Sequence, residues 1–83
     1  SNQTDIDILK LLPYCLLNWI KLNPHFELDE VIKEKIKYSV VIKDINNKKA
    51  YFWEFEHKDT LTKENIKKAL EAYIKALVES KKK

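Results

Sequence analysis

The chain of 83 residues contains no glycine and no arginine. Without glycine it cannot form the phosphate-cradling loop, the dinucleotide-binding fingerprint or the nucleophile elbow, since each needs a backbone that approaches its ligand closely. Without arginine it lacks the planar fork that most often reads guanine, because lysine is only a point charge. The net charge of +3 is therefore compatible with loose phosphate binding and gives little support for reading a base sequence.

Cysteine and long apolar runs are also scarce. The one cysteine, Cys15, cannot form an internal disulfide, so we expect an intracellular protein in a reducing compartment. No apolar run reaches the roughly 20 residues of a membrane span, and the polar, acidic start does not look like a secretory signal. We expect no membrane contact, no cofactor and no bound metal.

The most apolar stretch covers residues 9–22. Its polar side chains fall within an arc of roughly 80° on a helix, and they are Lys10, Tyr14, Asn18 and Lys21. A helix that is apolar almost all round needs neighbours on several sides, so we expect this one at the centre of the protein. Pro13 divides the stretch into a short helix that ends near Leu12 and a main helix over 13–22, or kinks a single helix.

Two further helices are predicted from apolar spacing. One runs from about residue 27 to 36 with Leu28, Val31, Ile32 and Ile36 on one face, with acids at its start and lysines towards its end. The other begins after Thr60 or Thr62, and Lys81–Lys83 should fray at its end. Its apolar stripe comprises Ile66, Leu70, Tyr73, Ile74, Leu77 and Val78.

Between these helices the period changes from 3.6 to 2, which predicts a β-hairpin with its turn at Asn46-Asn47. On one side, the pairs Tyr38–Phe55, Val40–Trp53 and Ile42–Tyr51 form an apolar face. The other, mostly polar side carries the pairs Lys37–Glu56, Ser39–Glu54 and Val41–Phe52. We therefore predict an α+β fold, one small domain over residues 1–83, in the order kinked or double helix, helix, antiparallel hairpin, helix. The hairpin should pack on the helices.

Few residues suggest catalysis. Cys15 could act as a nucleophile with His25 or His57 as its base, but a small thiol inside a buried helix is more simply a core residue. The acidic cluster of Glu54, Glu56, His57 and Asp59 contains alternating carboxylates that a strand places on one face. The simplest interpretation of that face is a solvated surface with a Lys37–Glu56 ion pair. We expect that the protein is not an enzyme.

Residues 36–78, a hairpin ending in Glu-Phe-Glu-His-Lys followed by an amphipathic helix, resemble the core of PD-(D/E)xK nucleases. The resemblance implies an Asp on the first strand and Glu-x-Lys on the second, together holding magnesium. With Glu54 as the Glu, Ser39 stands where the Asp should be and Glu56 replaces the Lys. With Glu56-His57-Lys58 as the motif, Lys37 faces the Glu. The resemblance therefore implies a degenerate relative without a metal site.

Lysines border the hairpin at positions 43, 48, 49 and 58. If the first stretch is two helices, the predicted order becomes that of a winged helix, with residues 27–37 as recognition helix and Lys43, Lys48, Lys49 and Lys58 as phosphate contacts. Acids at the start of that helix would repel the nucleic acid at the end that usually meets the bases.

The leading hypothesis is a non-catalytic protein–protein interaction or assembly module, because the predicted helices and hairpin offer more apolar surface than 83 residues easily hide. The candidate interface is the flank formed by Leu11, Cys15, Trp19 and Leu22, and the partner is another protein or a second copy. The alternatives are the winged-helix-like nucleic-acid-binding domain, the degenerate nuclease-like domain, and a small apolar-ligand carrier with the central helix and hairpin as pocket walls.

Overall fold

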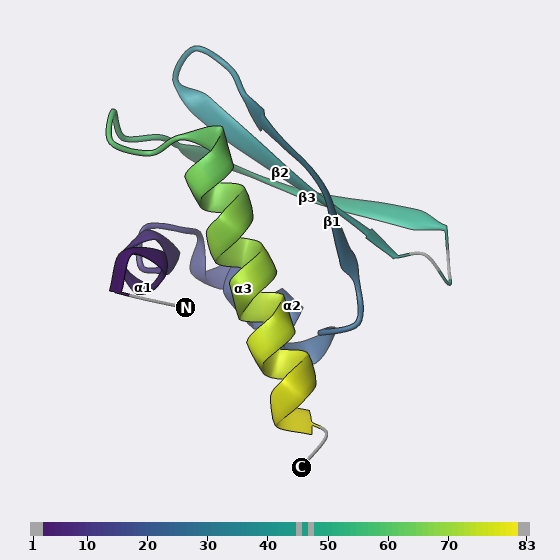
Figure 1. The fold of residues 1–83 in the computed structure, drawn as a ribbon. Coiled ribbons are helices and arrows are strands. Elements are labelled where there is room, and N and C mark those ends of the chain that lie inside the picture. The colour runs from purple at the N-terminus through teal and green to yellow at the C-terminus, as the bar shows by residue number, and fades with distance from the viewer. Residues whose placement is uncertain (1–2, 45, 47, 82–83) are drawn as a thin grey trace.

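A computed structural model describes residues 3–44, 46 and 48–81 as two short helices, a three-stranded antiparallel sheet and one long helix (Figure 1). In chain order the elements are α1 (Gln3–Leu9), α2 (Tyr14–Leu22), β1 (Glu27–Lys33), β2 (Lys37–Asp44), β3 (Lys49–Glu56) and α3 (Lys63–Lys81). The predicted α+β class is confirmed. None of the helices in the described part of the chain is long and apolar enough to cross a membrane.

Pro13 separates the first two helices, which decides between the two alternatives that the sequence left open. It has φ −58° and ψ 133° at the N-terminal cap of α2. The carbonyl of Pro13 accepts hydrogen bonds from the backbone N–H groups of Leu16 and Leu17, so α2 begins directly after it. At the other end, the side-chain amide of Asn23 donates to the Trp19 carbonyl at 2.9 Å and closes α2.

The predicted helix over residues 27–36 is wrong, because residues 27–33 form strand β1. In a regular strand, Leu28 and Val31 would lie on opposite faces, because side chains alternate between the faces and these two residues are three positions apart. The register shifts between Leu28 and Glu30, so that Leu28 opposes Ile42 and Val31 opposes Val40. The bulge absorbs one residue and brings both apolar side chains to the same face. Ile36 lies in the turn before β2 and is 64% exposed.

The predicted register of the hairpin is confirmed in all six pairs. Val40 opposes Trp53, Ile42 opposes Tyr51, and the pairing runs without irregularity from Lys37↔Glu56 to Asp44↔Lys49. The turn predicted at Asn46-Asn47 lies partly outside the described residues. In its described part, the Asn46 N–H donates to Asp44 Oδ1 at 3.1 Å, and Lys48 has φ 55°, in the left-handed region that glycine would favour.

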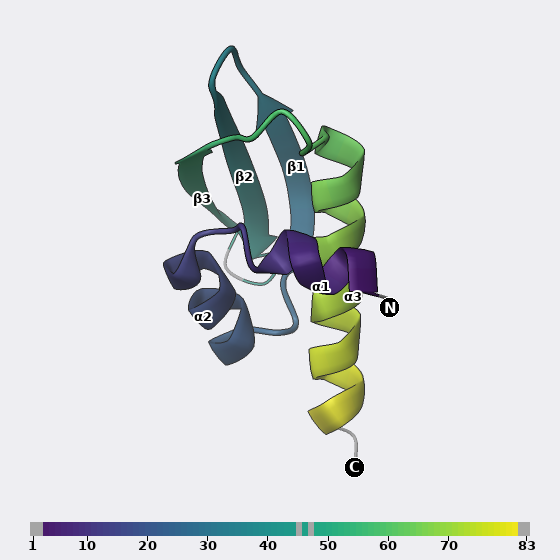
Figure 2. The same ribbon diagram turned by 90° about the vertical axis from the view of Figure 1, so that its left-hand side faces the viewer.

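All three helices lie on the same side of the sheet, α2 towards β3 and α3 towards β1 (Figures 1 and 2). Beneath them, Val31, Val40 and Ile42 are buried, and Ile66 and Leu70 of α3 pack into the same core. The first helix also packs against the last, since α1 contacts α3. None of the helices in the described residues lies over the opposite face of the sheet.

The expectation of a central helix with neighbours on several sides is wrong for α2. Only Leu16 and Ile20 of this helix are buried. Tyr14 and Leu22 are about four-fifths exposed, at 79% and 78%. Two buried residues one turn apart anchor α2 on one side, Leu17 and Trp19 are half-buried, and the other apolar side chains of the helix face outward.

The start of α3 is fixed by two hydrogen bonds. The Thr62 hydroxyl oxygen accepts from the Asn65 N–H at 3.1 Å, which makes Thr62 the cap among the two threonines proposed from the sequence. Just before it, the buried Tyr38 hydroxyl donates to the Leu61 carbonyl at 2.6 Å. This second bond ties the chain that enters α3 to the sheet. Lys81 is the last residue of α3, and the rest of the predicted frayed tail lies outside the described residues.

Tyr38→Phe is expected to lower the free energy of unfolding by about 1 kcal/mol, since it removes a buried hydrogen bond. Urea titration should detect this, with the exposed Tyr14→Phe as a control that changes little.

Burial also raises the pKa of the Tyr38 hydroxyl above the ordinary 10.0. The unfolded chain therefore releases this proton first, so the stability that depends on neutral Tyr38 is full below pH 10.0 and is lost as the pH rises above it. Equal alkaline losses in Tyr38→Phe and the parent protein would contradict this assignment.

Candidate interaction surface

Four aromatic rings join α2 to the sheet. The Trp19 ring centroid lies 4.7 Å from that of Phe26, 4.8 Å from Tyr51 and 5.2 Å from Trp53. All four side chains are half-buried. Since these rings reach from the helix to the beginning of β1 and to β3, Trp19 holds the otherwise lightly buried α2 in place.

The flank predicted as an interface is only partly assembled. Cys15 and Leu22 lie on the outward side of α2 and are exposed. Leu11 is 40% exposed but precedes the helix, and Trp19 turns towards the hairpin. We use "α2 flank" below for the exposed residues Leu11, Cys15 and Leu22 with Trp19 at their border.

Two exposed residues, Ile6 and Tyr14, were not part of the interface predicted from the sequence, although Tyr14 was expected on the outward arc of its helix. Ile6 is 44% exposed and Tyr14 is 79% exposed. Both line an open groove of about 310 Å³ between the first two helices, together with Leu9, Lys10, Leu12 and Leu17. The sequence did indicate that residues 9–22 carry more apolar surface than one buried helix face needs. Periodicity alone could not say which side of the helix would remain exposed.

The candidate catalytic groups are not assembled around Cys15. This cysteine is exposed, so the expectation of a buried core residue is wrong. His25 is an exposed turn residue. The Nε2 atom of His57 lies 2.8 Å from the Lys35 carbonyl oxygen, and its backbone N–H donates to the Ile36 carbonyl. His57 thus fastens the β1–β2 turn to the end of β3, which is a structural role.

The acidic cluster does not come together at one place, because the His57 ring lies 5.2 Å from the ring of buried Tyr38 and Asp59 lies in the loop beyond β3. Glu54 and Glu56 are exposed on the outer face, opposite Ser39 and Lys37 as the register predicted. The Lys37 ammonium lies 3.8 Å from Glu54 Oε2, so the ion pair joins Lys37 to Glu54, where the sequence predicted Glu56. A lysine occupies the place beside this carboxylate that a nuclease-like site would give to a metal ion. In the described part of the chain, no three His, Cys, Asp or Glu side chains gather as a metal site.

Glu54→Ala and Glu56→Ala are therefore expected to leave the fold unchanged, and calorimetric titration with Mg²⁺ or Mn²⁺ should give no stoichiometric heat with the parent protein. The physical reason is the ammonium of Lys37, which repels a cation from Glu54. A tight heat of binding that disappears in Glu54→Ala would restore the nuclease-like interpretation, and Glu64→Ala on α3 serves as the control.

The lysines proposed for nucleic-acid binding fall into two groups. Lys43, Lys48 and Lys49 are exposed at the turn between β2 and β3. Lys58 is exposed beyond the other end of β3, which is about 23 Å long. The winged-helix order also fails, because residues 27–33 are a strand and supply no recognition helix.

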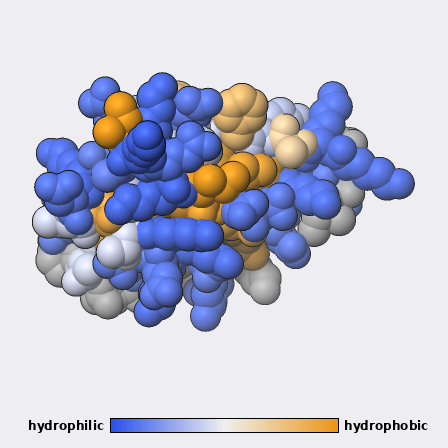
Figure 3. Space-filling view, turned by 90° about the horizontal axis from the view of Figure 1, so that it is seen from above, coloured by the Kyte–Doolittle hydropathy of each residue, from blue (hydrophilic) through white to orange (hydrophobic). Residues whose placement is uncertain are grey.

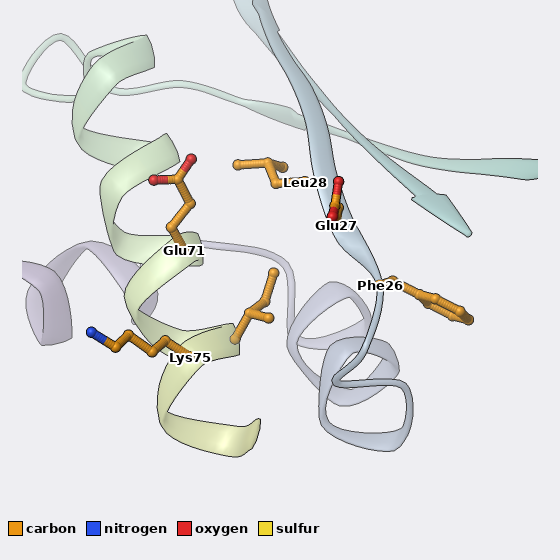
Figure 4. A pocket seen from close by; sticks show the side chains of 6 residues that line it. Phe26, Glu27, Leu28, Glu71 and Lys75 are labelled. Atoms are coloured by element: carbon orange, nitrogen blue, oxygen red, sulfur yellow. The ribbon is translucent and has the colours of Figure 1, made fainter. Parts of the chain in front are cut away.

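Surface grooves give little support to a ligand carrier. The predicted walls, α2 and the aromatic face of the hairpin, meet through Trp19 and Trp53 at 5.2 Å, so the rings themselves fill the space. A separate groove of about 310 Å³ lies between β1 and α3, where Glu27, Glu71 and Lys75 surround an apolar floor and Phe26 turns away towards Trp19 (Figure 4). Its charged rim and open shape are typical of a solvated groove between packed elements.

Seen from above, hydrophobic side chains form a band across a mainly hydrophilic surface (Figure 3).

No family model, curated protein or solved structure matches the chain.

Proposed function

We propose that this protein is a non-catalytic interaction module that binds another protein through the α2 flank. The observation that supports this most directly is the distribution of exposed apolar side chains. Among the described residues, six large hydrophobic side chains are exposed, and four of them lie between residues 6 and 22: Ile6, Leu11, Tyr14 and Leu22. Two of these four, Leu11 and Leu22, belong to the α2 flank. Scattered exposed hydrophobic residues are ordinary, but such a concentration over α1, α2 and the link between them is typical of a contact surface.

The energetics favour a partner on this surface. Covering one large apolar side chain stabilises a complex by about 1.5–3 kcal/mol before the costs of association. Leu22 and Cys15 stand on an anchored helix, because Leu16 and Ile20 fix its other side in the core. A partner would therefore meet a preorganised surface, with little loss of conformational entropy on binding.

The exposed Cys15 is the sole cysteine, so it can carry a photo-crosslinker at the proposed surface. In extract of the source cells, the labelled protein should yield a discrete adduct that disappears with Leu22→Glu. The matched control moves the label to Glu79→Cys on α3 in a Cys15→Ala background, and should not yield that adduct. The same pattern of adducts from both positions would refute a specific α2 interface.

A second candidate is phosphate-directed nucleic-acid binding at the turn between β2 and β3, supported by the exposed Lys43, Lys48 and Lys49. Glu27 opposes Lys43 across β1 and β2, which offsets part of this charge. Filter binding at two salt concentrations is the test: binding through phosphates should weaken steeply as salt rises, and a protein that retains no oligonucleotide at low salt excludes this function.

A further inference from the structure

The outer edge of β3 is open, and its hydrogen-bonding pattern can be read from one contact. The His57 N–H donates to the Ile36 carbonyl, one step beyond the pair Lys37↔Glu56. Hydrogen-bonded pairs alternate along an antiparallel ladder. The odd-numbered residues of β3 therefore bond to β2, and the even-numbered residues from Ala50 to Glu56 turn their N–H and C=O groups outward.

The two edges of the sheet are not equivalent. β1 carries the bulge at Leu28/Glu30 and packs against α3, two features that hinder the addition of a strand. β3 pairs with β2 over eight consecutive residues without a bulge and has no described strand beyond it. β3 is therefore the regular, unprotected edge of this sheet, and it extends the proposed function to a surface distinct from the α2 flank.

We propose that β3 pairs antiparallel with β3 of a second copy, about a two-fold axis at Phe52, to form a continuous six-stranded sheet. Phe52, 66% exposed, then meets Phe52 of the second copy on the open face. By the same register, Glu56 reaches the start of β3 of the second copy, beside the turn residue Lys48, so the symmetric dimer brings opposite charges together at both ends of the seam. On the helix side of the sheet, Tyr51 opposes Trp53 of the second copy.

Neighbouring registers are less favourable. An axis at Glu54 opposes two carboxylates directly, and an axis at Trp53 places Phe52 against Glu54 of the second copy. A register can form only if residues with outward-facing backbone groups oppose each other. This excludes any axis that lies between two residues, because it would oppose even-numbered to odd-numbered residues. Among the rest, the register centred on Phe52 joins the two exposed rings, and aromatic cross-strand pairs stabilise antiparallel sheets.

Charge exchange tests this register in the full chain. Glu56→Lys alone should weaken dimerisation about threefold to tenfold by light scattering and sedimentation, since it brings two ammonium groups together at each end of the seam. Adding Lys48→Glu should restore the parent affinity, because the two charges then exchange places. Failure of the double variant to recover would contradict the register, and a parent protein that is monomeric at every concentration would overturn the dimer itself.

A disulfide test gives a second measurement that does not depend on charge. In a Cys15→Ala background, Phe52→Cys should form a covalent dimer on mild oxidation, since directly opposed residues have Cα atoms about 5.5 Å apart. Glu54→Cys should not, because its two copies would lie about 13 Å apart. Equal crosslinking by both variants would refute the two-fold axis. A monomer that still forms the Leu22-dependent adduct from Cys15 would retain the proposed function and eliminate the dimer alone.

Discussion

Val40→Lys is expected to unfold the protein, with a loss of about 5 kcal/mol in the free energy of unfolding. Val40 is wholly buried in the centre of β2, where an ammonium group would have no water and no opposite charge. A domain of this length has a total stability of about 4–12 kcal/mol, so the substitution would remove between about two fifths and all of it. Circular dichroism during urea titration measures the change.

The neighbouring Val41→Lys is the matched control, because alternate residues of a strand face opposite sides of the sheet. Val41 lies on the face without helices and is half-buried. Its replacement should cost less than about 1 kcal/mol. If Val41→Lys proved as damaging as Val40→Lys, the assignment of the two sheet faces would be wrong.

Trp19→Ala is expected to lower the free energy of unfolding by about 3 kcal/mol, because it removes the ring that contacts Phe26, Tyr51 and Trp53. The near-ultraviolet dichroism of the remaining aromatic cluster should also weaken. Tyr14→Ala on the same helix is the control, since this side chain is 79% exposed and should change stability by less than about 0.5 kcal/mol. An equal effect of both substitutions would mean that α2 is held by its general apolar character and not by Trp19.

The hairpin could be predicted from sequence because two independent signals agree on it. Alternation assigns Tyr38, Val40 and Ile42 to one face, and the expected turn position then fixes their partners on β3. A shift by one residue would turn every apolar side chain to the wrong face, so few alternatives were possible.

β1 could not be predicted from periodicity because its bulge imitates a helix. The spacing of three between Leu28 and Val31 fits one helical face, while a regular strand would separate them. The extra residue at the bulge is a feature of pairing with β2, and the local sequence does not reveal it. The segment also carries acids before lysines, the order that a helix dipole favours, so the charge pattern predicts a helix as well.

The candidate interface was predicted in composition but not in orientation. The sequence indicated that residues 9–22 carry more apolar surface than one helix face can bury, and exposed Leu22 agrees with that. Which flank would remain outside depends on where Trp19 finds its aromatic partners, two of which, Tyr51 and Trp53, lie more than thirty residues away on β3. Contacts over such separations are set by tertiary packing and leave no local signal.

The contact between the first and last helices has a consequence for the order of folding. The strands are joined to their neighbours by short turns, so β1, β2 and β3 can pair soon after collapse at a small entropic cost. Bringing α1 onto α3 closes a loop of more than fifty residues, which is slower because distant segments must meet. During synthesis α1 is made before α3, so the buried Ile8 has no α3 to pack against until the strands have followed. The contact between α1 and α3 is therefore expected to form late in folding.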